Sequence, residues 1–210
     1  MKKELNEDVL VFVDLETTGL NPNNGWILEV GGVIADAKTL EVIDSRSWVV
    51  KPIAETRKAG PFAAARVASI EEAKGRADAY VLKMHEENGL WLEVEASTQT
   101  LIDVGQEFPH WFHENGLRTS DQVYTFAGNG PDRFDRVWLR HNWAPLQRMD
   151  DLFHYRSLDV SNLHHAFRMA GYPLGEKLLR KPSNHRAVDD CLQTLEDWKH
   201  IVNTIAMLPA

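Results

Sequence analysis

The apolar and polar positions of this chain follow a strand-like pattern first and a helix-like pattern later. Apolar runs at residues 10–15, 27–35 and 42–50 are separated by turn-forming residues at 21–25 and by a short link at 36–40. Short apolar runs bounded by turn residues are typical of buried strands. The start of the chain therefore predicts an antiparallel meander of three strands.

Strands and helices alternate in the second half of the chain. A strand at 123–127 precedes a helix at about 132–142, and a strand at 155–160 leads directly into a helix from Ser161. The last helix, at about 187–207, has apolar residues at intervals of three and four, which predicts one face packed on the sheet. The whole pattern predicts an α/β fold with a mixed five-stranded sheet flanked by helices.

The middle of the chain predicts helices outside the sheet. Residues 53–79 are rich in alanine and in charge, and Gly60 and Pro61 divide them. We expect one or two helices there, as an insertion into the fold. Thr100 and Asp103 then match the capping pair that begins a helix.

Composition and charge narrow the setting. With 210 residues and 43% hydrophobic content, the chain can bury a full core, and residues 1–210 are expected to form a single domain. The net charge of -8 means that local contacts and bound cations must hold any nucleic acid. Cys191 is the only cysteine, and residues 1–8 lack the apolar core of a signal peptide, so we expect a cytoplasmic protein. No apolar run approaches the roughly 20 residues that span a bilayer, so no membrane association is expected.

The first candidate metal ligands lie at the end of the first strand. Asp14 and Glu16 are two residues apart on this strand, so their carboxylates project from one face and can bind the same cation. Thr17, Thr18 and Gly19 then break the strand pattern. The pair is therefore expected at a strand end that a ligand can reach.

A third acid stands near the start of the helix predicted at 132–142, where Asp132 and Asp135 are alternatives. Asp135 is preferred because Trp138 and Leu139 anchor its helix in the core. Asp132 falls in the first turn, where an acid often serves only to complement the helix dipole.

His185 and Asp190 supply the last two candidates. They are five residues apart, a rotation of about 140° on a helix, so they cannot share one helical face. We expect His185 in a mobile segment after Pro182, from which it can reach a metal held by Asp190 in the first helical turn. Carboxylates are preferred ligands of Mg²⁺ and Mn²⁺, two such ions assist phosphodiester hydrolysis, and a neutral histidine can take the proton of the attacking water.

These residues fall within three short motifs. They are DLETTGL, the D-x-x-[FW]-L pattern of Asp135 to Leu139, and HRAVDD. Together they resemble the motifs of the DEDDh 3′→5′ exonuclease superfamily, which has a ribonuclease H-like fold. More narrowly, MHEENGL followed by EVEAST, the segment AGN, and FHYRSLDVSNL are similar to oligoribonuclease, over about residues 9–202.

The resemblance implies a role for each candidate. Asp14, Glu16, Asp135 and Asp190 would hold two divalent cations, Mg²⁺ or Mn²⁺, with His185 as the general base. The products would be nucleoside 5′-monophosphates released from a nucleic acid 3′ end.

The resemblance also implies contacts to the substrate and a homodimer. Leu20 matches the position that wedges against a terminal base, His85 a residue that touches the substrate, and Ser161 one that contacts its phosphate. Tyr155 and Arg156 match a pair donated to the substrate across a homodimer interface.

The chain departs from the oligoribonuclease pattern in the substrate region. Tyr80 replaces a tryptophan but can still stack on a base. Asn129 keeps its substrate-binding position, whereas Gly130 replaces the serine that follows it. Residues 53–79 are longer by roughly fifteen residues, and the interval from Asn129 to Asp135 is longer by one. The lost hydroxyl weakens the case for a strict preference for dinucleotides.

Two other functions compete with an exoribonuclease that degrades short RNA. A DNA-directed exonuclease of the proofreading type shares every catalytic residue, and only HYRSLDVS and MHEENGL favour RNA. An inactive nucleic-acid-binding scaffold would be indicated by loss of a metal ligand, and none is missing. Arg180, Lys181 and Arg186 flank His185 and either contact phosphates or form a solvated basic loop.

Overall fold

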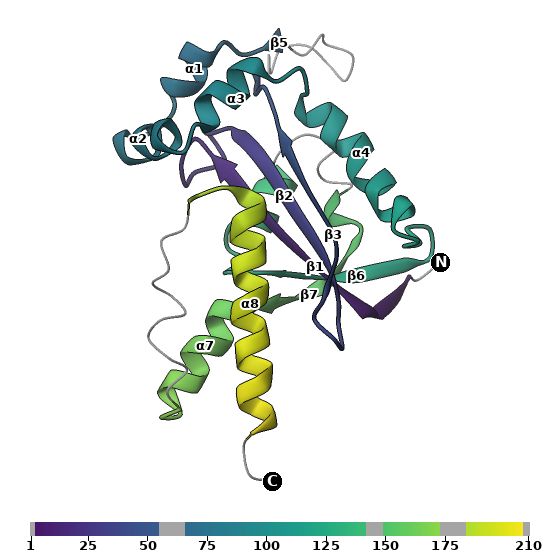
Figure 1. The fold of residues 1–210 in the computed structure, drawn as a ribbon. Coiled ribbons are helices and arrows are strands. Elements are labelled where there is room, and N and C mark those ends of the chain that lie inside the picture. The colour runs from purple at the N-terminus through teal and green to yellow at the C-terminus, as the bar shows by residue number, and fades with distance from the viewer. Residues whose placement is uncertain (1–2, 55–65, 142–148, 173–183, 208–210) are drawn as a thin grey trace.

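A mixed five-stranded sheet forms the centre of the computed structural model (Figure 1). The structure describes residues 3–54, 66–141, 149–172 and 184–207. The strand order is β3-β2-β1-β6-β7; β1 and β3 pair antiparallel with β2, and β6 runs parallel to both β1 and β7. The predicted fold class is therefore confirmed. The strands are β1 Glu4–Thr17, β2 Ile27–Asp36, β3 Val42–Val49, β6 Gln122–Gly128 and β7 Phe153–Asp159.

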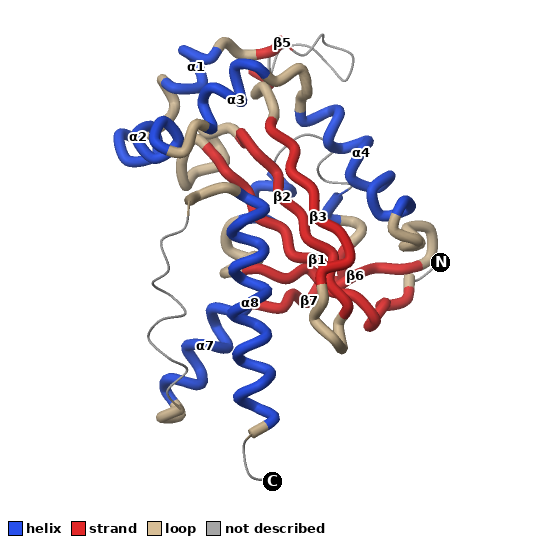
Figure 2. Tube along the Cα trace, viewed as in Figure 1, coloured by secondary structure: helices blue, strands red, loops and turns tan. Residues whose placement is uncertain are grey.

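Alternate residues of β1 point to opposite faces of the sheet, and different helices cover these faces (Figure 2). Val11 lies in a buried cluster with residues of α4 Leu101–Glu114. Phe12 lies in another cluster, with residues of α7 Val160–Met169 and α8 Ala187–Ala206. The fold therefore has two large hydrophobic cores, one on each face of the sheet.

Three short helices gather beyond one end of the sheet (Figure 1). They are α1 Ile70–Lys74, α2 Ala79–Glu87 and α3 Leu90–Ala96. A smaller buried cluster joins Leu28 of β2 to Trp91 of α3. These helices are thereby fixed against the same strand end that carries the candidate acids.

Of the one or two helices expected in residues 53–79, α1 lies in the part that the structure describes, but strands are found at 53–54 and 66–67. β4 Ile53–Ala54 and β5 Arg66–Val67 form a two-stranded antiparallel ribbon, and residues 55–65 lie outside the described ranges. Helix α1 begins only after Ser69, whose capping box with the third helical residue fixes the start. Alanine content favoured a helix, but pairing between segments distant in sequence overrides local propensity.

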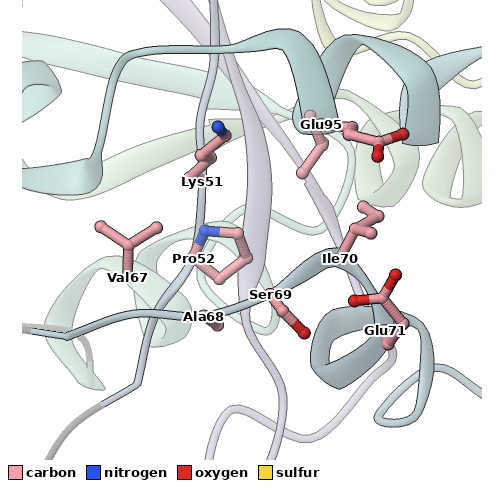
Figure 3. A pocket seen from close by; sticks show the side chains of 9 residues that line it. Lys51, Pro52, Val67, Ala68, Ser69, Ile70, Glu71 and Glu95 are labelled. Atoms are coloured by element: carbon pink, nitrogen blue, oxygen red, sulfur yellow. The ribbon is translucent and has the colours of Figure 1, made fainter.

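A cavity of about 270 Å³ lies beside this ribbon, next to α1 and α3. Figure 3 shows its lining, in which Pro52 and Val67 are apolar and Lys51, Glu71 and Glu95 are charged. None of its lining residues belongs to the pocket that contains the candidate acids.

Two elements begin three or more residues away from the predicted position. β1 begins early, because the Glu4 amide donates to the Asp121 carbonyl at 2.9 Å and the strand continues its pairing with β6. Helix α5, Asp135–His141, starts later than the predicted helix at 132–142, and residues 142–148 are outside the described part. Of the helices that the structure describes, none has the length and apolar character needed to cross a membrane.

Candidate active site

The end of β1 brings Asp14 and Glu16 to the face of the sheet that α8 covers. Both follow Phe12 at every second residue, and Phe12 packs with residues of α8. β1 ends at Thr17, whose hydroxyl donates to the Gly19 carbonyl at 2.6 Å. The acid pair therefore lies at the strand end, with Glu16 only 6% exposed.

The third acid beside this pair is Asp135, and Asp132 lies elsewhere. Asp135 begins α5, is 2% exposed, and is close enough for its charge to raise the pKa of Asp14. Asp132 Oδ1 instead accepts hydrogen bonds from the Ser157 hydroxyl at 2.9 Å and from Arg136 Nη1 at 3.4 Å. Asp132 is thus engaged with β7 and with a buried arginine.

His185 and Asp190 complete the group. Ligand atoms of Glu16, His185 and Asp190 all lie within 4.8 Å of one another. Asp190 is in the first turn of α8, where its amide donates to the Arg186 carbonyl at 3.0 Å. His185 precedes the helix and has a φ of 51°, so it meets Asp190 without sharing a helical face with it. The structure therefore brings all five predicted catalytic residues together.

Burial and mutual repulsion raise the pKa values of three carboxyls. Burial, followed by the charge of Asp190, raises the pKa of Glu16 to about 9. Burial also raises the pKa of Asp135 to about 8, and burial together with neighbouring carboxylates raises that of Asp14 well above its usual value. Burial and repulsion therefore favour the protonated forms of these carboxyls, and a bound cation would favour the ionised forms.

The donor set fits divalent cations that prefer oxygen ligands. Asp135 Oδ1 is buried and has no hydrogen-bond partner among the described residues. Buried acceptors normally have a partner, and a cation is one that also relieves the repulsion between carboxylates. Asp14, Glu16 and Asp190 offer oxygens of the same type at the same place, so these four residues could hold divalent cations.

Asp14, Glu16 and Asp190 line a pocket of about 350 Å³. Leu20 and Tyr80, both predicted to touch the substrate, line it and are 82% and 70% exposed. Phe134 and Met84 add apolar walls. A pocket whose lining combines acids with exposed apolar side chains suits a ligand that joins a phosphate to a flat base.

His85 lies beside the site but is not exposed to it. Its side chain is 0% exposed, its Nε2 is 3.0 Å from the Thr17 carbonyl oxygen, and the same nitrogen is 3.8 Å from Glu16 Oε2. The ring packs edge-on against Trp91. This arrangement differs from the expected contact with substrate: His85 supports the end of β1 from within.

Asn129 and Ser161 are not among the residues that line the pocket. Asn129 Nδ2 donates to the Thr194 hydroxyl at 2.8 Å, which ties it to α8. The Ser161 hydroxyl donates to Asp159 Oδ1 at 2.7 Å, and the Gly130 amide donates to the same oxygen at 3.2 Å. In this structure both predicted substrate contacts are engaged in hydrogen bonds within the protein.

Tyr155 and Arg156 also lie away from the pocket, on the edge strand β7. Tyr155 is 70% exposed, and the Arg156 guanidinium lies 5.2 Å from the centre of its ring. Neither residue lines the pocket of its own chain.

One group of residues near the site was missed from the sequence. Arg186, considered there either as a phosphate contact or as part of a solvated basic loop, forms ion pairs with Glu29 at 3.0 Å and with Glu93 at 2.6 Å. Glu29 is 1% exposed. The available signal was a single acid inside the apolar run of β2, because a buried charge requires a partner.

The fold is that of the DEDDh exonucleases. The nuclease domain of 3′hExo, a DEDDh family member, bound to rAMP, superposes with a TM-score of 0.58 over 98% of this chain and 97% of that chain, at 16% identity. The complex of E. coli ExoI with single-stranded DNA gives a TM-score of 0.59 over 95% of this chain and 41% of that one, at 17% identity.

In sequence, the chain is similar to proteins named oligoribonuclease. That of Neisseria meningitidis serogroup A is 25% identical over 191 residues, covering 91% of this chain and 89% of the relative. That of Pseudomonas aeruginosa is 26% identical over 196 residues, covering 93% and 94%. No family model matches the chain. The chain is therefore similar in sequence to oligoribonucleases and has the fold of the DEDDh exonucleases.

Proposed function

We propose that this protein is a 3′→5′ exoribonuclease that hydrolyses short RNA to nucleoside 5′-monophosphates. The observation that carries the proposal is the convergence of carboxylates and His185 on one pocket that also holds Leu20 and Tyr80. Sequence relatives named oligoribonuclease support RNA as the substrate.

The chemistry follows from the residues around the pocket. Asp14, Glu16, Asp135 and Asp190 are the proposed ligands of two divalent cations, and we propose Mg²⁺ or Mn²⁺ as the ions. Two such cations, when bound, activate water and stabilise the leaving oxygen. His185 accepts the proton of the attacking water on an unprotonated ring nitrogen, as a general base does.

The same pocket suggests how the 3′ end is held. Leu20 packs against the terminal base, and Tyr80 stacks on a base, a contact worth about 1–3 kcal/mol. His85 acts indirectly, through Thr17 and Glu16. Asn129 and Ser161 remain proposed substrate-binding residues. To bind the substrate, they exchange their hydrogen bonds within the protein for hydrogen bonds to the substrate.

We further propose that the protein works as a homodimer in the cytoplasm. Tyr155 and Arg156, exposed on the edge strand β7, would reach the partner's substrate. Sedimentation velocity is expected to show a dimer. The double variant Tyr155→Ala, Arg156→Ala is expected to weaken this dimer. The control Leu92→Ala, at a side chain of α3 that is 73% exposed, is expected to leave it unchanged. A wild-type protein that stays monomeric at high concentration contradicts this proposal.

A reducing compartment such as the cytoplasm suits the single cysteine, Cys191, which is buried and free.

The decisive experiment is a time course on defined oligonucleotides. Purified protein with Mg²⁺ or Mn²⁺ is given 5′-labelled RNA of two, seven and about twenty nucleotides beside matched DNA, and Asp135→Asn serves as the inactive control. We expect stepwise shortening from the 3′ end, fastest for the short RNA. Equal or faster shortening of long DNA would indicate a function in DNA processing. If the wild-type protein shows no cleavage beyond that of Asp135→Asn, the proposal that the protein is an enzyme is contradicted.

A further inference from the structure

The backbone of His185 has an unusual conformation. Its φ of 51° lies in the left-handed region, and Leu40 is the only other non-glycine residue with positive φ among those the structure describes. Residues with a Cβ populate this region sparsely, and such a conformation persists where the surroundings impose it. The contacts on each side of His185 show what imposes it.

Asn88 holds the carbonyl side of this segment. It lies at the junction of α2 and α3, and its Nδ2 donates to the His185 carbonyl at 2.6 Å and to the Asn184 carbonyl at 3.2 Å. Its Oδ1 accepts the Leu90 amide at 3.0 Å, which fixes the orientation of the side-chain amide. One side chain therefore ties two successive carbonyls before α8 to the start of α3.

Arg186 holds the other side. Its guanidinium donates to both carboxylate oxygens of Glu93, at 2.6 and 2.7 Å, and to both oxygens of Glu29, at 3.0 and 3.2 Å. Glu29 also accepts the Ala187 amide at 3.3 Å and the Ser47 hydroxyl at 2.6 Å. Glu29 belongs to β2 and Glu93 to α3. Arg186, the residue next to His185, is therefore bound both to the sheet and to the small helices.

We propose that Asn88 and Arg186, with Glu29 and Glu93, are positioning residues that fix the His185 ring beside Glu16. Figure 1 shows α2 and α3 next to the start of α8, where this contact is made. The inference rests on the proposed role of His185 as general base. It assigns a task to α3 and a further one to α2, which also lines the pocket through Tyr80 and Met84.

A double-mutant cycle tests whether Asn88 acts through His185. Asn88→Ala is expected to lower kcat about tenfold with little change in KM, the lower range for loss of an outer-shell partner. In the His185→Ala background the same change is expected to have almost no further effect. An equal fall in kcat in both backgrounds overturns the proposal. Asn115→Ala is the matched control, since Asn115 also ends a helix and donates from Nδ2 to a main-chain carbonyl, that of Trp111 at 2.9 Å.

A second measurement is independent of activity. In protein labelled with ¹³C at histidine, the ring signal of His185 is assigned by its loss in His185→Ala. We expect Asn88→Ala to shift or broaden this signal and Asn115→Ala to leave it unchanged; an unchanged signal in Asn88→Ala overturns the proposal. If Asn88→Ala does not fold, Glu93→Gln, at a half-exposed side chain, gives the same comparison. Full activity of His185→Ala would refute the role of His185 as general base but not the positioning of its ring by Asn88. The ring signal tests the positioning separately.

Discussion

At the scale of residues, position decides between chemically identical side chains. Asp132 and Asp135 are three residues apart, yet Asp132 pairs with Arg136 while Asp135 is buried beside Asp14. The difference arises because α5 begins at Asp135, whereas Asp132 lies in the preceding turn and faces Ser157 of β7. Burial raises the pKa of Asp135 to about 8, as is typical of a carboxyl at a functional site.

Neutralising these two acids is expected to have opposite outcomes. Asp135→Asn removes a proposed ligand and is expected to lower kcat by at least about 100-fold, more than loss of an outer-shell partner usually costs. Asp132→Asn keeps its hydrogen-bonding shape and is expected to retain activity near that of the wild type. Steady-state kinetics with a short RNA checks both, and comparable losses in the two variants contradict the assignment.

Tyr80 allows a second comparison at this scale. Tyr80→Ala is expected to raise KM for short RNA by about tenfold, in keeping with the roughly 1–3 kcal/mol of one stacked base, while Tyr80→Phe stays close to the wild type. Tyr172→Ala is the control, because Tyr172 is also partly exposed but does not line the pocket. If Tyr80→Ala leaves KM unchanged and lowers kcat instead, Tyr80 does not stack on the bound substrate.

At the scale of elements, the contact between β2 and α8 sets the place of His185 and Asp190. Gly31 of β2 lies directly under the first residues of α8: a Cβ built on Gly31 would be 2.5 Å from the carbonyl carbon of Ala187 and 2.6 Å from the nitrogen of Val188. The absence of a side chain at Gly31 therefore allows the helix to start close to the sheet. Backbone atoms cannot move aside as a flexible side chain can.

We expect Gly31→Ala to displace the start of α8. The change is expected to lower the free energy of unfolding by about 1–3 kcal/mol, the usual cost of overpacking, and to lower kcat because Asp190 moves with the helix. Gly19→Ala is the stability control, since its Cβ would meet nothing within 4 Å. Denaturant unfolding followed by circular dichroism measures both. A Gly31→Ala protein as stable as Gly19→Ala contradicts the close contact.

At the scale of the whole molecule, the acidic site makes stability depend on pH and on cations. The pKa of Glu16 is raised to about 9 and that of Asp135 to about 8, both far above their values in an unfolded chain. At a pH between the unfolded and the folded pKa of each carboxyl, the folded state binds more protons than the unfolded state. The free energy of unfolding therefore falls as pH rises through this range. Cations bind the deprotonated carboxylates and oppose this fall.

The melting temperature in EDTA is therefore expected to fall between about pH 5 and pH 9, the range between the ordinary and raised pKa values of these carboxyls. Mn²⁺ is expected to raise the melting temperature more at pH 8 than at pH 5. Asp135→Asn is expected to show a weaker pH dependence in EDTA and a smaller response to Mn²⁺. Differential scanning fluorimetry measures all three effects. A response to Mn²⁺ that is largest at pH 5 contradicts the origin of the shifts.

The sequence by itself determined the features that depend on short spacings. The alternation along β1 placed Asp14 and Glu16 on one face, and the stripe of α8 predicted its packing on the sheet. These are local properties, because side chains repeat every two residues in a strand and every three or four in a helix. The same local rules required His185 to precede the helix that carries Asp190.

Only the tertiary structure decided the contacts between distant segments. It paired the ribbon of β4 and β5 where composition favoured helix, buried His85, and joined Arg186 to Glu29, which is 157 residues away in the chain. No local period encodes such contacts, because each depends on which surfaces the packed sheet and helices bring together. The conformation of His185 belongs to this class: Asn88 and Arg186 bind the two sides of His185 only once α2, α3 and β2 have assembled around it.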